Sequence, residues 1–309
     1  MRINAVNKIP LSFLEDDAIE AALSSAPSTP GDTVVRLKLG WLSGHSKEQL
    51  EQALQSIQQA AIIIKAATNV HRVGLVTTSD DEVRLIPFHG LSAEWKPTAD
   101  LDEEYNNSYP GYISPKNGPK SSNATLDEIQ RQITGENIPA MDLTYLGNAN
   151  EDTANSIFAK ITRGELEQWR LGESASHVAF LTPFSNTPGF TVLVPRKPLG
   201  SDILAMAEPD LRELAAAIWD VSHLLQSSAA LGASRVGLIF EGMEIDYAHA
   251  KLIPILDKGL GNLDQHVPEA AFTDVYTGSI SSRPGPPSDI DVLQELQVRL
   301  LRAAETRKS

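Results

Sequence analysis

The amino-acid sequence predicts an α+β fold in which one unit of strands and a helix occurs twice. Three observations support this class. Short runs rich in β-branched residues alternate with two long segments whose apolar residues recur at helical spacing. The order strand, helix, strand, strand and irregular tail is predicted in both halves of the chain. Several short motifs also recur between the halves, three of them at one constant offset.

The first half of the chain contains one complete copy of this order. Residues 33–38 (TVVRLK) predict a strand. Ser46 is a candidate N-cap for the amphipathic helix KEQLEQALQSIQQAAIIIKAAT that follows it. The remaining elements of this half are two strands, a loop and a helix, at residues 73–78, 84–88, 93–123 and 124–134.

The second half repeats the order and adds a hairpin at its start. We predict strands at 156–161, 177–181, 190–196, 236–242 and 250–256, with an amphipathic helix at 208–230. Residues 1–30 are dominated by helix- and loop-forming residues, so we expect no counterpart of the hairpin in the first half.

Recurring motifs indicate an internal duplication. RVGL starts at 72 and 235, LIP at 85 and 252, Tyr-x-Gly-x-Ile-Ser at 109 and 276, and Gly-Pro at 118 and 285. The last three pairs are each separated by 167 residues, a regularity that chance does not easily produce. The alternative is coincidence between two ordinary α+β segments. The tails that carry the last two motifs are expected to be ordered, and they are candidates for lids exchanged between the halves.

Composition and charge exclude several classes of function. The chain is 41% hydrophobic and 21% charged, as in soluble globular proteins. Its formal net charge is −14, so its electrostatic field repels nucleic acid, which we exclude as a partner. Cysteine is absent, and the seven histidines are scattered, so no metal site is expected. No apolar run predicts a signal peptide or membrane span, which together with the other observations indicates a cytoplasmic location and no membrane partner.

Three segments of the second half carry a family resemblance. They are SIFAKITRGE at its start, residues 173–198, and YAHAKLIP at 247–254. They are similar to the first strand and turn, the second and third strands, and the closing His-x-His-x-His signature of the HIT (histidine-triad) family. The middle histidine of that signature is kept as His249, while Tyr247 and Lys251 occupy the outer positions. The resemblance implies a five-stranded antiparallel sheet with a helix packed across it.

The resemblance also implies covalent catalysis. His249 would attack the α-phosphate of a nucleotide or related phosphodiester, and the covalent intermediate would pass to water, phosphate or another acceptor. Neutral imidazole is a good nucleophile near pH 7. Strand alternation puts residues 247, 249 and 251 on one face, so Lys251 can bind phosphate oxygens and Tyr247 can orient His249 or a leaving group. In the alternative, His249 is a buried structural histidine, Lys251 a surface charge and Tyr247 part of the core.

Two places depart from the family's pattern. Thr182 stands where the family has an acidic residue that grips the ribose hydroxyls, and a threonine cannot clamp a diol as a carboxylate does. The family's phosphate-holding Gly-Gln-Ser/Thr turn corresponds here to a segment containing Glu244 and Asp246, which repel phosphate unless a cation bridges them. Three interpretations stay open: a bound Mg²⁺, carboxylates turned outward, or a substrate that is not a nucleotide.

The first half lacks the nucleophile. By the constant offset, Glu82 corresponds to His249 and Arg84 to Lys251. Residues 1–140 are therefore expected to be a degenerate, catalytically silent HIT-like half, beside a HIT-like domain with a C-terminal extension at 146–309. We expect the halves to form an intramolecular pseudo-dimer, with a further homodimer left open. Arg84 is a candidate to reach the substrate from the silent half.

Three functions remain open on these grounds. The first is a nucleotidyl or phosphodiester hydrolase or transferase that uses His249. The second is an enzyme of the same fold that performs acid–base chemistry on a small polar substrate, and the third is a non-catalytic binding protein. The expected partner is a small phosphorylated or polar molecule, and no cofactor is required unless Mg²⁺ bridges the carboxylates.

Overall fold

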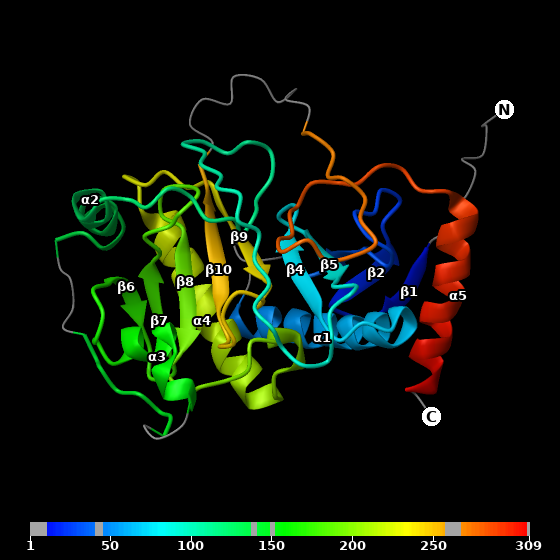
Figure 1. Ribbon diagram of the computed structural model, residues 1–309, viewed down its shortest axis with the longest axis horizontal. Coiled ribbons are helices and arrows are strands. Elements are labelled where there is room, and N and C mark those ends of the chain that lie inside the picture. Colours follow the sequence, from blue (N-terminus) through cyan, green and yellow to red (C-terminus); the bar gives the residue numbers. More distant parts are fainter. Residues whose placement is uncertain (1–10, 41–45, 137–140, 149–151, 257–266, 308–309) are drawn as a thin grey trace.

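The computed structural model describes residues 11–40, 46–136, 141–148, 152–256 and 267–307. Within these residues the centre of the molecule is one antiparallel sheet of ten strands (Figure 1). The strands are β1 (Ser12–Glu15), β2 (Ile19–Leu23), β3 (Thr33–Leu37), β4 (Val73–Thr77), β5 (Glu82–Pro87), β6 (Trp169–Glu173), β7 (His177–Leu181), β8 (Thr191–Pro195), β9 (Arg235–Phe240) and β10 (Ala250–Ile255). The helices are α1 (Lys47–Thr68), α2 (Asn123–Thr134), α3 (Ile157–Thr162), α4 (Glu208–Ser227) and α5 (Ile290–Thr306), with 3-10 turns η1 (Asp152–Asn155) and η2 (Ile203–Ala205).

The two sets of five strands are arranged in corresponding orders. The sheet runs β1-β2-β3-β5-β4 and then β9-β10-β8-β7-β6. Counted inward from its own edge, each set places its first, second, third, fifth and fourth strand in that sequence. At the centre β4 pairs with β9, where Leu75 lies opposite Phe240 and Val76 opposite Ile239. Because these two strands hydrogen-bond edge to edge, the expected five-stranded sheet is replaced by one continuous sheet of ten strands.

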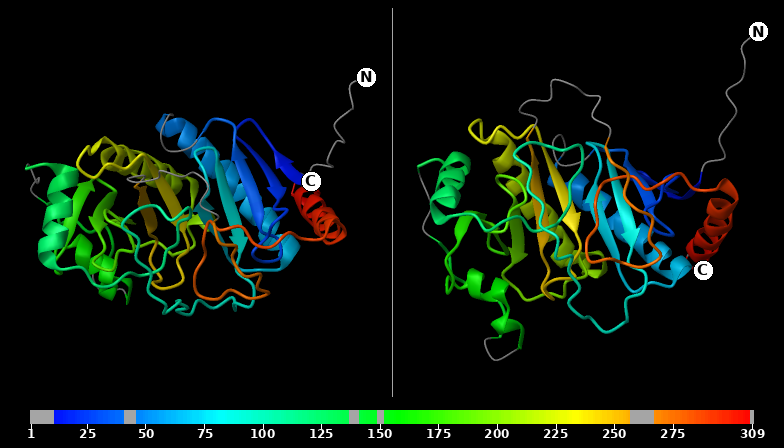
Figure 2. Two further views of the ribbon diagram at one scale, coloured as in Figure 1. Left: turned by 90° about the horizontal axis from the view of Figure 1, so that it is seen from above. Right: turned by 45° about the horizontal axis from the view of Figure 1, so that its top comes forward.

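Two long helices cover one face of the sheet. α1 and α4 lie side by side there, as Figure 2 shows. The predicted N-cap of α1 is confirmed, since the Ser46 side chain accepts a hydrogen bond from the Gln49 backbone amide and the Ser46 backbone amide donates one to the Gln49 side-chain oxygen. Ile57 of α1 and Ile218 of α4 are fully buried in the core between these helices and the strands. None of the helices in the described residues is long and apolar enough to cross a bilayer.

The opposite face is covered by two irregular segments, residues 93–121 and 267–288, which we call the first and second tails (Figure 2). β8 illustrates the division between the faces. Leu193 packs into the helix-side core, whereas Val192 and Val194 pack into a second core under the tails. Both faces of the strands are therefore buried, which explains why their sequences read as nearly continuous apolar runs.

Each tail crosses to the half of the chain that does not contain it. In the first tail, the Gly118 amide donates to the carbonyl of Phe184 over 2.8 Å. In the second, the Gly285 amide donates to the carbonyl of Ala26 over 2.9 Å. The helices that follow also cross, so that α2 packs on β6 and α5 on β1, at opposite ends of the sheet (Figure 1). Each tail is therefore held by hydrogen bonds to the other half of the chain, while its role as a lid stays a prediction.

Two sequence predictions were wrong. Residues 156–161 do not form a strand, because the Ser156 side chain caps the helix α3 by accepting a hydrogen bond from the Phe158 amide. A short apolar run does not distinguish a strand from a buried helical turn by its periodicity. Residues 1–30 do contain a hairpin, β1–β2, whose turn is held by Asp16 through bonds from the amides of Ala18 and Ile19. Pairing with β3 here overrides the low strand preference of Ala and Glu in β2.

The crossing of the second tail gives a testable prediction. A Cβ at Gly285 would collide with the backbone carbonyl of Pro27. We expect Gly285→Ala to lower the free energy of unfolding by about 1–3 kcal/mol, as overpacking against rigid backbone does. Denaturant unfolding measures this. Gly200→Ala is the matched control, because a Cβ there meets nothing within 4 Å and its unfolding free energy should change by less than about 0.5 kcal/mol. Equal stability of the two variants would contradict the crossing.

Candidate active site

The segment before β10 is a tight turn that aims a row of side chains toward the tails. The turn begins at Gly242, whose φ is +69° and where a Cβ would collide with the carbonyl of Ser201. Only glycine fits both conditions. The Ala248 amide then donates to the carbonyl of Leu199 over 2.8 Å, which anchors the chain as it enters β10. Tyr247 of this segment and Ile253 and Ile255 of β10 lie in the tail-side core.

His249 is held in one tautomer by its own chain. Its Nδ1 lies 2.7 Å from the carbonyl oxygen of Tyr247, so Nδ1 carries the proton and donates it to that oxygen. Nε2 is then unprotonated, and it makes no hydrogen bond with any described residue. The ring lies 5.0 Å from the ring of Phe158 in α3, and the side chain is 4% exposed.

The surroundings of His249 keep its imidazole neutral. Burial lowers its pKa to about 4, and the positive charge of Lys251 acts in the same direction. The hydrogen bond to the Tyr247 carbonyl opposes the shift but is smaller. At neutral pH the side chain is therefore a neutral base with a lone pair on Nε2.

Tyr247 contributes its backbone rather than its hydroxyl to this arrangement. The hydroxyl donates to the carbonyl of Pro195 over 2.8 Å, and the side chain is fully buried. Burial raises the pKa of the phenol far above its usual range, so the hydroxyl stays protonated at neutral pH. The ring also contacts Phe158 edge-on at 6.0 Å. Tyr247 thus orients His249 through its carbonyl oxygen.

Lys251 is paired with a carboxylate that the sequence did not single out as a site residue. Its Nζ lies 3.3 Å from Oε2 of Glu241 and 3.4 Å from the carbonyl of Pro115 in the first tail. The other oxygen of Glu241 accepts hydrogen bonds from the Tyr276 hydroxyl and the Ile280 amide of the second tail. The side chains of Lys251 and Glu241 are 9% and 5% exposed. Both tails therefore meet at this ion pair.

The remaining substrate-binding candidates in the second half lie around this row at different depths. Thr182 is half-buried, and its Oγ1 accepts a hydrogen bond from the Phe184 amide. Glu244 is exposed, at 3.5 Å from the amide nitrogen of Asn117. Asp246 is also exposed and accepts hydrogen bonds from the backbone and hydroxyl of Ser201. In the described residues no three His, Cys, Asp or Glu side chains are grouped so as to hold a metal ion.

Arg84, the candidate from the first half, is engaged elsewhere. It is 3% exposed, and its guanidinium binds both oxygens of Asp32 and the carbonyl of Arg283. Register places it in the same row across the sheet as Lys251, through the pairs Arg84–Val76, Val76–Ile239 and Ile239–Lys251. Three strand spacings of about 4.8 Å separate it from Lys251. The structure therefore does not bring Arg84 together with His249.

No model of a known protein family matches the chain. A HIT-like protein involved in cell-cycle regulation from Bartonella henselae is 23% identical over 27% of this chain and 72% of its own, with a TM-score of 0.24. A uridylyltransferase is 10% identical over 94% of this chain and 86% of its own, with a TM-score of 0.46. A galt-like protein from Arabidopsis thaliana is 9% identical over 91% and 83%, with a TM-score of 0.47.

The hydrogen bond from His249 to the Tyr247 carbonyl predicts an NMR result. With ¹⁵N-labelled histidine, we expect the His249 imidazole to be protonated on Nδ1 alone and not to titrate between pH 5 and 8, since its pKa is lowered to about 4. A proton on Nε2, or a titration of His249 near pH 6.5, would contradict the geometry.

Proposed function

We propose that this protein is a nucleotidyl or phosphodiester hydrolase or transferase that acts through a covalent intermediate on Nε2 of His249. The observation that carries the proposal is the 2.7 Å contact between Nδ1 of His249 and the carbonyl of Tyr247. A histidine nucleophile needs one ring nitrogen protonated and fixed, so that the lone pair of the other is aimed at the reacting atom. The lowered pKa supports the same role, because a protonated imidazole has no lone pair to donate.

The reaction would proceed in two displacements. In the first, the Nε2 lone pair forms a bond to phosphorus, and the bond from phosphorus to the leaving oxygen breaks with its electron pair. In the second, water or another acceptor attacks phosphorus, the phosphorus–nitrogen bond breaks, and the neutral imidazole returns. The hydrogen bond to Tyr247 stabilises the positive charge that the ring carries between the two steps.

Lys251 is the proposed phosphate-binding residue of the row. Lys251 lies two residues after His249. Its ammonium group would stabilise the charge that develops on the phosphate oxygens. Glu241 already balances that ammonium group, so the substrate has to share Lys251 with a carboxylate. Thr182 is the proposed contact to the sugar of a nucleotide. We assign Glu244 and Asp246 to the exposed rim of the site, following their exposure and their bonds to Asn117 and Ser201.

We further propose that the chain is a divergent, internally duplicated member of the histidine-triad superfamily. Residues 1–140 would be its silent half and residues 146–309 its active half, paired as an intramolecular pseudo-dimer. The palindromic strand order and the reciprocal crossing of the tails support this proposal. The silent half would act by covering the site, since Pro115 of its tail contacts Lys251 directly.

A second candidate function is acid–base chemistry on a small polar substrate at the same place. The specific observation in its favour is the buried Lys251–Glu241 ion pair. Glu241 neutralises the ammonium group that would otherwise bind phosphate, and it places a carboxylate beside the site. In this case Nε2 of His249 would accept a proton from the substrate instead of forming a bond to phosphorus.

Intact-protein mass spectrometry without acid distinguishes the two functions. After incubation with a panel of nucleotides and nucleotide sugars, we expect a nucleotidyl or phosphoryl mass on the wild type that acid removes, because phosphorus–nitrogen bonds to histidine are acid-labile. His249→Asn should carry no adduct, since it lacks the attacking nitrogen.

His223→Asn is the matched control for this experiment. His223 is a half-buried histidine stacked on Trp219 in α4, on the helix side of the sheet, and its loss should leave the adduct unchanged. An adduct that survives in His249→Asn would contradict the assignment of the nucleophile. Absence of both adduct and turnover with every compound of the panel would rule out the nucleotide chemistry and leave the acid–base function ahead.

A further inference from the structure

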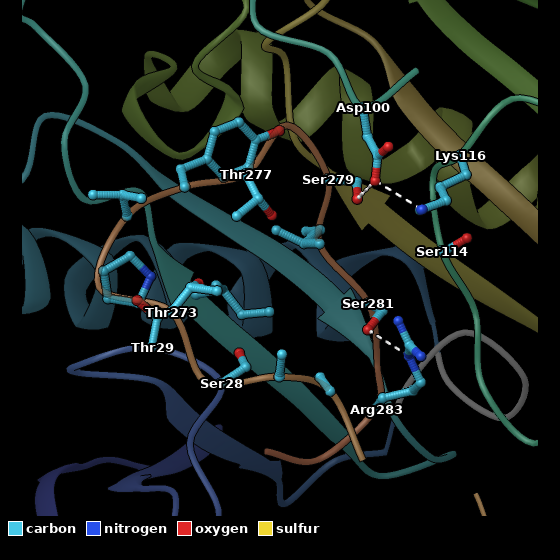
Figure 3. A pocket seen from close by; sticks show the side chains of 17 residues that line it. Ser28, Thr29, Asp100, Ser114, Lys116, Thr273, Thr277, Ser279, Ser281 and Arg283 are labelled. Atoms are coloured by element: carbon cyan, nitrogen blue, oxygen red, sulfur yellow. Dashed lines mark hydrogen bonds and ion pairs between the residues drawn. The ribbon is translucent and has the colours of Figure 1, made fainter. Parts of the chain in front are cut away.

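A separate cavity of about 250 Å³ lies over β5 in the first half, between the loop before β3 and the two tails (Figure 3). Its floor contains the apolar residues Ile86, Pro87 and Ile280. Hydroxyl side chains dominate the rest of its wall: Ser28, Thr29, Ser114, Thr273, Thr277, Ser279 and Ser281. Three charged residues also line it, namely Asp100, Lys116 and Arg283.

Two of these charges cancel each other. Nζ of Lys116 lies 2.8 Å from Asp100, and the Ser279 hydroxyl donates to the same carboxylate over 2.8 Å. Figure 3 shows this group at one end of the cavity, with Arg283 at a distance from it on the wall formed by the second tail. The cavity therefore has one unbalanced positive charge, that of Arg283.

The guanidinium of Arg283 is positioned but not saturated. It lies 4.9 Å from the ring centre of Tyr112, which fixes its plane, and its Nε reaches the Ser281 hydroxyl at 3.4 Å. Its two terminal nitrogens make no hydrogen bond with any described residue. The hydroxyls of Thr29, Thr273 and Thr277 likewise have no hydrogen-bond partner among the described residues. The wall thus offers one guanidinium fork and several free hydroxyl groups.

The matching place in the second half is nearly closed. There a cavity of only about 20 Å³ is lined by Ile253 and Pro254 of β10 and by the first tail. In the shared Tyr-x-Gly-x-Ile-Ser motif, Tyr112 of the first tail corresponds to Ser279 of the second. The large Tyr112 ring lines the closed cavity and the small Ser279 side chain lines the open one. The cavity is therefore open because a small side chain replaces a large one at this position. The fold alone does not create it, since the corresponding place in the second half is nearly closed.

We infer that this cavity binds a small hydroxylated monocarboxylate of the sugar-acid class, with its carboxylate on Arg283 and its hydroxyl groups on the threonines. A guanidinium fork matches a carboxylate with two parallel hydrogen bonds. One unbalanced positive charge matches a monoanion better than a phosphate dianion, whose second negative charge would find no unpaired cation in the cavity. The volume lies below the roughly 300–1,000 Å³ of pockets for drug-sized ligands, which suits a single six-carbon chain or ring. The inference does not depend on the chemistry of His249.

Isothermal titration calorimetry with defined probes tests this inference. The probes are gluconate and glucuronate, with glucose and acetate as controls that carry only the hydroxyl groups or only the carboxylate. At least one sugar acid should bind the wild type at least ten times more tightly than either control. Glucose 6-phosphate is the dianionic competitor, and tighter binding of this compound than of both sugar acids would overturn the carboxylate assignment. No measurable binding of either sugar acid would overturn the site.

Variants assign the binding to the cavity. Arg283→Gln should weaken sugar-acid binding at least tenfold, and Ser279→Tyr, which copies the residue of the closed cavity, should abolish it. Arg302→Gln on the exposed side of α5 is the matched control and should bind as the wild type does. His249→Asn should also bind normally, which separates this inference from the proposed function. Thermal unfolding of each variant verifies that it is folded, and unchanged binding by folded Arg283→Gln would overturn the inference.

Discussion

The pairing of β4 with β9 is the contact on which the rest of the molecule depends. Two ladder pairs, Leu75 with Phe240 and Val76 with Ile239, form it together with two hydrogen bonds between the Thr77 hydroxyl and the Leu238 backbone. This contact turns two sets of five strands into one sheet. Because the sheet is continuous, α1 and α4 pack against each other over its centre and the two tails meet on the other face. At that meeting point the Ile113 amide donates to the Ser282 hydroxyl, and the Ser282 amide donates to the Ile113 carbonyl.

This arrangement explains how both tails contribute to the surroundings of Lys251. Lys251 is fixed from three directions: by its own strand, by Pro115 of the first tail, and by Glu241, which the second tail holds through Tyr276 and Ile280. Burial makes an ion pair costly unless further hydrogen bonds satisfy it, and the tails supply them. His249 depends less on the other half, since its tautomer is set two residues away in its own chain.

Local patterns predicted what local physics determines. The N-cap at Ser46, the helix α4 and the shared face of Tyr247 and His249 follow from capping and periodicity within a few residues. The sequence did not predict the helix α5 within the C-terminal extension, although Asp289 caps it. It did not disclose the hydrogen bonds that hold Glu241 or the ion pair between Arg84 and Asp32, because both depend on contacts between residues distant in the chain. The central β4–β9 pairing is of the same kind.

Native-state hydrogen exchange tests most directly whether the two halves form one cooperative body. The amides of β3 and β8 lie at corresponding places in the two sets of strands, each paired on both sides. If the β4–β9 pairing and the crossed tails unite the halves, these amides should exchange with opening free energies that agree within about 1 kcal/mol. The opening free energies of the two strands should also decrease in parallel as denaturant is added. Exchange of β3 through a much less costly opening that leaves β8 protected would show that the halves unfold separately, and would contradict the account.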